Sequence, residues 1–334
     1  MLRGAATKLA AAPFLGSLHM TLIPIFRPRD RALEVDIVRT NQVQGGVSTG
    51  FERLDEYFSI KRGYPITIAG EPYHGKSQFI KQILVNLSKL HGYKHCVYLG
   101  EDGTPEEIII ELQEIYLKKP IRAKDKDGNP REGVADSFEI QEAFDFVDKH
   151  FCIVNPDEFD IASFDIETFY GWVEQHEKEF QIKFDTTVVD PWNDLDLNIN
   201  SKGGREDIVL ADALKTVRQS SKKNNRTDFI VTHIAARFAN HRSEGGERYA
   251  TPAEANEYAG GQSHKRRGYQ MLLVYRPPAP DVFRLGRAKI ETDEGETWLI
   301  VQKSKPKGVG KLGRCSLYYN AKTQNYQEQT LGNE

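Results

Sequence analysis

The stretch Gly70-Glu71-Pro72-Tyr73-His74-Gly75-Lys76-Ser77 decides the fold of this 334-residue chain. Its spacing is G-x-x-x-x-G-K-S, and glycines at these places let the backbone turn its amide N–H groups toward an anion. In such a loop Lys76 reaches the β- and γ-phosphates of a nucleotide, and the Ser77 hydroxyl binds Mg²⁺. The stretch, with the adjoining Gln78, therefore predicts a site for a nucleoside triphosphate.

The residues on both sides of this loop support that interpretation. Residues 64–69 form an apolar, β-rich run, and after the loop apolar residues recur at helical spacing until Gly92. A helix that begins at the loop points the positive end of its dipole at the phosphates. We therefore expect the loop to join a buried strand to a helix.

Further strand-like runs are separated by helical patterns, which predicts an α/β fold with a mostly parallel central sheet flanked by helices. After the run at 95–99, Thr104-Pro105-Glu106-Glu107 has the pattern of a capping box with proline at the first helical position. Residues 118–134 are expected to form an exposed loop. The remaining expected strands are 151–154, 186–189, 229–232 and 271–275, with 297–303 and 315–319 as a C-terminal β-hairpin.

Composition excludes some classes of protein. Hydrophobic residues make up 39% and charged residues 28% of the chain, as in a globular domain, and no apolar run approaches the roughly 20 residues of a membrane span. The net charge of −3 gives no global sign of nucleic-acid binding, so a polyanion must be bound by local basic loops. The scattered Cys96, Cys152 and Cys315 predict reduced thiols in an intracellular protein, with neither disulfides nor a zinc site.

Two carboxylates follow expected strands, at the edge where parallel sheets bind ligands. Asp190 ends the run Val188-Val189-Asp190 and is predicted to hold Mg²⁺ together with Ser77. Glu101 is predicted to polarise the water that attacks the γ-phosphate, and the neighbouring Asp102 is an alternative for that role. Both positions are also compatible with simple acidic turns.

Basic and histidine side chains give further candidates. His233 ends a strand-like run, where it either senses the γ-phosphate or has no special role. Residues 235–267 show almost no apolar periodicity and include Arg237 and Arg242, so this long stretch either lines a channel for a phosphate backbone or is a solvated loop. Lys305 belongs to a lysine-rich hairpin that either discourages edge pairing or acts on a neighbouring subunit's nucleotide.

The order of these motifs resembles the ATPase domain of hexameric replicative DNA helicases of the DnaB and Twinkle type. The lead-in Ser48-Thr49-Gly50-Phe51-Glu52-Arg53-Leu54-Asp55 is similar to the family's s-T-G-f-x-x-L-D. Val189-Asp190-Pro191-Trp192-Asn193 is similar to the Walker B segment of phage members, and Gly260-Gly261-Gln262-Ser263 to a glycine-containing segment. The resemblance covers residues 46–320.

The resemblance implies a RecA-like P-loop NTPase that hydrolyses ATP with Mg²⁺, assembles as a hexameric ring, moves on single-stranded DNA and unwinds duplex DNA. It assigns catalysis to Lys76, Glu101 and His233, and it puts Lys305 where the family has an arginine finger. Lysine lacks the bidentate fork of arginine, so Lys303 and Lys307 remain alternatives. The other functions considered are a RecA- or KaiC-like ATPase that does not unwind DNA, and a nucleotide-switched loading or assembly factor.

We expect an N-terminal arm over residues 1–45, one ATPase domain over 46–325 and a tail over 326–334. Residues 1–20 are rich in alanine and have no acidic residue, as in an organellar transit segment, but we favour a disordered arm, a tag remnant or a true start at Met20. We favour a cytoplasmic protein. Because no primase-like domain precedes the motor in this sequence, any primase is expected to be a separate chain.

Overall fold

The computed structural model describes residues 27–40, 45–125, 127–159, 161, 163–196, 206–234, 242–244, 247–249, 252–259, 262–277, 281–285, 288–293 and 295–328. The chain divides into two compact units, Met1–Val43 and Gln44–Glu334. The first unit contains η1 (Pro28–Arg31) and α1 (Ala32–Thr40). The predictions for residues 1–20 lie outside the described residues.

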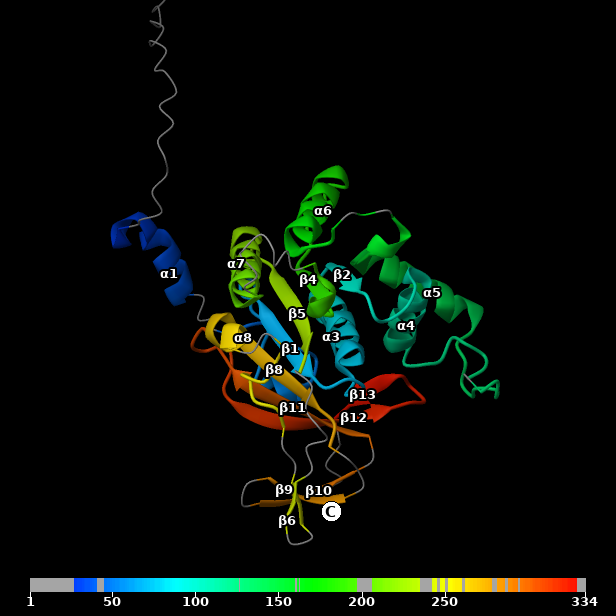
Figure 1. The fold of residues 1–334 in the computed structure, drawn as a ribbon. Helices are drawn as coiled ribbons and strands as arrows, with labels where there is room; N and C mark the ends of the chain where they lie inside the picture. Colours follow the sequence, from blue (N-terminus) through cyan, green and yellow to red (C-terminus); the bar gives the residue numbers. More distant parts are fainter. Residues whose placement is uncertain are drawn as a thin grey trace, which may run out of the picture. The chain divides into compact units, whose positions relative to one another are not determined.

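The core of the second unit is a nine-stranded sheet in the order β13-β12-β11-β8-β1-β5-β4-β2-β3 (Figure 1). The central strands run parallel, namely β1 (Ile66–Gly70), β2 (His95–Leu99), β3 (Phe151–Val154), β4 (Thr186–Asp190), β5 (Thr227–His233) and β8 (Gln270–Tyr275). The antiparallel strands are β11 (Glu296–Lys303), β12 (Gly313–Asn320) and β13 (Asn325–Gln327). The predicted α/β fold, its mostly parallel sheet and the C-terminal hairpin are confirmed.

Helices cover both faces of this sheet, and β2 shows the two layers clearly. Successive side chains of a strand point to opposite faces. Val97 and Leu99 pack in one apolar cluster with α3 (Lys76–His91), α4 (Pro105–Leu117) and α5 (Ser137–His150). Cys96 and Tyr98 pack in a second cluster with α6 (Ile166–Glu179) and α7 (Glu206–Asn224). None of the described helices has the length and apolar character that crossing a membrane requires.

Local signals set the ends of the two helices nearest the loop. The Thr104 hydroxyl accepts from the Glu107 amide at 3.4 Å, and the Glu107 carboxylate accepts from the Thr104 amide at 3.0 Å, so the capping box before α4 forms as predicted. Helix α3 ends at Gly92, whose φ of 67° lies in the left-handed region that glycine tolerates.

A second, four-stranded sheet was not foreseen. Its order is β10-β9-β7-β6, with bounds β6 (Arg242–Glu244), β7 (Glu247–Tyr249), β9 (Asp281–Leu285) and β10 (Ala288–Thr292). The prediction of an unstructured stretch over 235–267 is therefore wrong in part, because β6, β7 and α8 (Gln262–Arg267) lie within it. Strands of three residues rich in charge carry too little periodicity to be recognised from sequence.

The C-terminal boundary also differs from the expectation. Tyr326 belongs to β13 and is only 2% exposed, and the Glu328 carboxylate accepts from the Arg53 amide at 2.7 Å. The packed domain therefore extends past residue 325, where we expected it to end.

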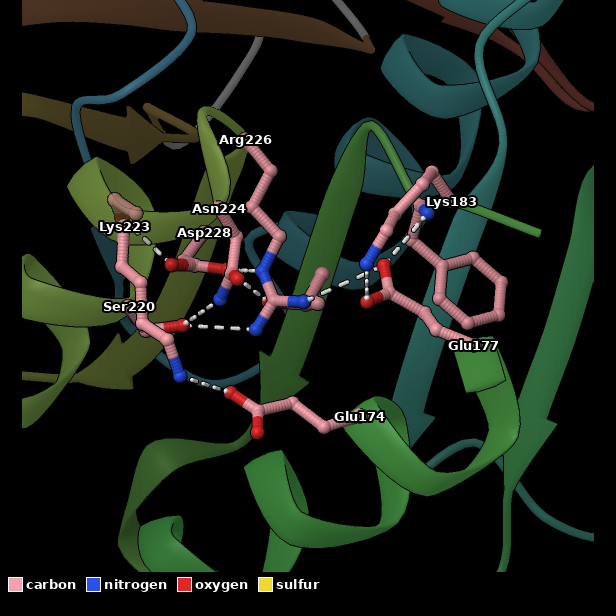
Figure 2. A network of polar contacts seen from close by, with 11 residues as sticks. Glu174, Glu177, Lys183, Ser220, Lys223, Asn224, Arg226 and Asp228 are labelled. Atoms are coloured by element: carbon pink, nitrogen blue, oxygen red, sulfur yellow. Dashed lines mark hydrogen bonds and ion pairs between the residues drawn. The ribbon is translucent and has the colours of Figure 1, made fainter. Parts of the chain in front are cut away.

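A buried polar network lies at the amino ends of β4 and β5, at the opposite edge of the sheet from Asp190 and His233 (Figure 2). Arg226 is fully buried, and its Nε donates to Asp228 Oδ1 at 2.9 Å. Its Nη2 donates to the Ser220 hydroxyl at 2.8 Å, and its Nη1 lies 3.9 Å from Glu177 Oε1. The network thus joins β5 to α7 and α6.

Candidate nucleotide-binding site

The phosphate loop is held in a conformation that needs its glycines. Gly75 caps α3 with φ at 84°, and a Cβ there would lie 2.1 Å from the Tyr326 hydroxyl oxygen. At Gly70 a Cβ would lie 2.5 Å from the Val274 carbonyl oxygen. The Lys76 side chain folds back into the loop, where its Nζ donates to the Glu71 carbonyl at 3.1 Å. The sequence pattern therefore reflects close backbone packing as well as turn formation.

A cavity of about 510 Å³ opens beside this loop and the ends of β2 and β5. Its volume is in the range of small-ligand sites. Its lining includes most of the side chains singled out from the sequence: Pro72, Tyr73, Gly75, Lys76, Ser77, Gln78, Glu101, Asp102 and His233. The structure thus brings Lys76, Ser77, Glu101 and His233 around one cavity.

Asp190 is a buried carboxylate beside the Ser77 hydroxyl. It is 3% exposed, and burial raises its pKa to about 7 although the Ser77 hydroxyl donates a hydrogen bond to it. Its Oδ2 atom is buried and has no hydrogen-bond partner among the described residues. An orphaned carboxylate oxygen beside a hydroxyl offers the hard oxygen ligands that Mg²⁺ prefers. Ser77 and Asp190 therefore fit a nucleotide-bound Mg²⁺.

Glu101 and His233 form a pair at the mouth of the cavity. His233 Nε2 lies 3.3 Å from Glu101 Oε1, and the Glu101 side chain is 56% exposed. The register of β1 and β5 sets His233 opposite Gly70, where the phosphate loop begins. The Nδ1 atom of His233 is buried without a hydrogen-bond partner in the described part of the chain. This histidine thus links the start of the Gly70–Ser77 loop to Glu101.

The predicted lead-in motif also folds around a specific polar contact. Asp55 accepts from the Ser48 hydroxyl at 2.5 Å and from the Thr49 amide at 2.8 Å. Asn86 on α3 in turn donates to the Thr49 carbonyl at 3.0 Å. The lead-in therefore braces the helix that follows the phosphate loop.

Strand β13 supports the loop in a way that no sequence pattern indicated. Gln82 on α3 exchanges two hydrogen bonds with the Tyr326 backbone, at 2.9 and 2.6 Å. Gln78 donates to the Gln324 carbonyl at 2.7 Å, and the Tyr326 hydroxyl donates to the Gly75 carbonyl at 3.3 Å. These contacts join two segments that lie near opposite ends of the domain in sequence.

Lys305 is not brought to this cavity. Strand β11 runs antiparallel to β8 and pairs Lys303 with Met271, near the start of β8, whereas the cavity lies at the carboxyl ends of β1 and β5. Lys305 is exposed just beyond Lys303. A role for Lys305 in hydrolysis therefore requires a second subunit.

The predicted DNA contacts are only partly described. Arg237 and the segment Gly260-Gly261 lie outside the described residues. Arg242 is the first residue of β6.

Comparison with known proteins agrees with the motifs. Over 216 residues the chain is 24% identical to "Twinkle homolog protein, chloroplastic/mitochondrial" from Arabidopsis thaliana, a match that covers 64% of this chain and 29% of that protein. This chain thus corresponds to less than a third of that relative's length. No family model matches the chain.

Two solved structures share the fold. One is an isolated ATPase domain, which superposes with a TM-score of 0.66 at 14% identity and covers 90% of this chain and 98% of its own. A DnaB-like replicative helicase, solved for its interactions with primase, gives the same TM-score and identity over 90% of this chain and 67% of that one. The chain therefore has the RecA-like ATPase fold of DnaB-type replicative helicases and is related in sequence to a Twinkle homologue.

Proposed function

We propose that this chain is an Mg²⁺-dependent ATPase motor that forms a hexameric ring, moves along single-stranded DNA and unwinds duplex DNA. The cavity that gathers Lys76, Ser77, Glu101 and His233 on a helicase-type fold carries this proposal. A primase is the proposed partner, because the DnaB-like structure concerns interactions with primase. We propose a cytoplasmic location.

In the proposed reaction each side chain has a distinct part. Lys76 binds the β- and γ-phosphates, while Ser77 and Asp190 would hold Mg²⁺, which would supply charge neutralisation to the phosphates. Glu101 accepts a proton from the attacking water, and His233 orients Glu101 and registers the loss of the γ-phosphate. Strand displacement from a forked duplex, with ATP and Mg²⁺, tests the whole proposal. ATP turnover without strand displacement would instead favour a RecA- or KaiC-like ATPase, and ATP binding with little turnover a loading factor.

The small sheet supplies a surface for the DNA. Its strand registers pair Lys289 with Arg284, Arg284 with Tyr249, and Tyr249 with Arg242. These four positions are therefore aligned in register across the sheet and form one row. Cations interleaved with an aromatic residue suit a single strand, whose phosphates and bases they can contact. We propose that this row, together with Arg237, contacts the DNA backbone.

Replacing Arg242, Arg284 and Lys289 with alanine should weaken single-strand binding and lower the magnitude of its salt slope by roughly two, since each lost phosphate contact removes about 0.7. Binding to oligonucleotides of several sequences, titrated against salt, measures both. Arg248→Ala is the matched control, because its register partner is Phe283 and it is not one of the four positions of this row. An unchanged slope in the triple variant would remove the row from the DNA surface.

Mixing two inactive variants should restore ATPase activity if Lys305 acts across subunits. Lys305→Ala protomers keep an intact phosphate loop, and Lys76→Ala protomers keep an intact Lys305, so some interfaces in mixed rings combine both. Steady-state phosphate release over a range of mixing ratios is the measurement. Absence of recovery in rings that are demonstrably mixed would exclude Lys305 as the residue acting in trans.

A further inference from the structure

A buried lysine lies behind the loop that carries Glu101. Lys81, on α3, has a side chain only 4% exposed, and its Nζ lies 3.0 Å from Asp102 Oδ2 and also contacts the Glu111 carboxylate on α4. Burial alone would lower the pKa of Lys81, but the attraction of Asp102 and Glu111 outweighs it and raises that pKa. Lys81 is therefore a permanent cation, and a buried cation is stable only while its partners stay in place.

The loop between β2 and α4 is fixed at both ends by backbone and capping contacts. At its start the Gly100 amide donates to the Asp190 carbonyl at 2.8 Å, and at its end Thr104 caps α4. Between these ends stand the adjacent carboxylates Glu101 and Asp102. Asp102 is 18% exposed at its side chain and is bound by Lys81, whereas Glu101 is 56% exposed and lies against His233.

We propose that Lys81 is a positioning residue that, by holding Asp102, fixes this loop so that the Glu101 carboxylate faces His233 and the nucleotide cavity. Asp102 is then the anchor of the loop, and Glu101 alone is available to accept a proton from water. The inference rests on the proposed role of Glu101 in ATP hydrolysis. It also gives a reason why Glu101, and not the neighbouring Asp102, accepts the proton from water.

A purely structural role for Lys81 predicts different behaviour. If Lys81 only ties α3 to α4, its contact with Glu111 would matter as much as its contact with Asp102. Glu111 has a side chain 32% exposed and is absent from the cavity lining. Glu111→Gln is therefore the matched control: it removes one partner of Lys81 and leaves the Asp102 anchor intact.

The experiment compares kcat, KM and nucleotide-analogue affinity for Lys81→Met, Asp102→Asn, Glu111→Gln and Glu101→Gln, together with the double variant Lys81→Met/Glu101→Gln. Glu101→Gln should lower kcat at least about a hundredfold. Lys81→Met and Asp102→Asn should each lower kcat roughly ten- to a hundredfold, as expected for a misplaced catalytic group, with nucleotide affinity unchanged. Glu111→Gln should change kcat less than about twofold. A further variant, Lys81→Arg, keeps the positive charge and should retain most of the kcat that Lys81→Met loses.

The double variant separates positioning from an independent effect. If Lys81 acts through Glu101, Lys81→Met should cost no further activity once Glu101 is glutamine. The inference would be overturned if the double variant lost as large a factor in kcat relative to Glu101→Gln as Lys81→Met loses relative to the unaltered protein. Normal kcat in both Lys81→Met and Asp102→Asn would also overturn it. Normal kcat in Glu101→Gln would instead overturn the proposed role of Glu101. Should Lys81→Met fail to fold, Asp102→Asn and its double with Glu101→Gln carry the same comparison, because they keep the side-chain volume.

Discussion

Lys76→Ala should reduce ATP turnover at least about a hundredfold, the scale of losing a preorganised electrostatic contact to a reacting phosphate. Lys76 is 5% exposed and lines the cavity that also holds Glu101 and Asp102. Burial lowers its pKa, and Asp190, Glu101 and Asp102 act in the opposite direction. Alanine would leave Glu101 and Asp102 lining a cavity for an anionic nucleotide without the Lys76 cation beside them.

Phosphate release at saturating ATP and Mg²⁺ measures the loss, and an analogue-binding titration shows whether the nucleotide still enters. Lys89→Ala is the control, because Lys89 lies exposed near the end of the same helix, where it donates to the Tyr116 carbonyl and lies over the Tyr116 ring, and it does not line the cavity. Undiminished hydrolysis in the Lys76 variant would mean that this cavity is not where ATP is hydrolysed.

The part of the site closest to the phosphate loop could be read from the sequence because its signals are local. A glycine-rich turn, a capping box at Thr104 and a left-handed Gly92 each fix a few neighbouring residues. The parallel sheet places the other candidate residues, since the carboxyl ends of parallel strands meet at one edge. That rule alone groups Glu101, Asp190 and His233 near the loop, as the structure does.

What the sequence did not reveal depends on contacts between distant segments. Tyr326 pairs with Gln82 across almost the whole domain, and no short-range pattern marks either residue. Lys81 looks like an ordinary polar position on an amphipathic helix until two carboxylates are seen beside it. Strands β7 and β9 pair although α8 and β8 lie between them in the chain. Such pairings are set by the global fold and not by local propensity.

The largest effect on stability is expected at Arg226. Arg226→Met should lower the free energy of unfolding by about 3–5 kcal/mol, because it leaves the buried Asp228 carboxylate without its cation. Asp228 is only 1% exposed, whereas Glu177 keeps its ion pair with Lys183 at 2.7 Å. The guanidinium also packs 5.1 Å from the centre of the Tyr170 ring, so the variant loses a cation–π contact as well.

Urea denaturation of Arg226→Met measures this loss, and Lys223→Met is its control within the same network (Figure 2). Lys223 also pairs with a glutamate, Glu174, but its side chain is 70% exposed, and exposed pairs contribute less than about 1 kcal/mol. Adding Asp228→Asn to Arg226→Met should recover part of the stability, since the amide removes the uncompensated charge. Ser221 and Thr187 donate to different oxygens of Asp228, at 2.6 and 2.5 Å. The amide can accept from one of these hydroxyls through its oxygen and donate to the other through its NH2 group. A loss in Arg226→Met no larger than that in Lys223→Met would show that Asp228 is already neutral in the folded chain, and that it is held by hydrogen bonds alone.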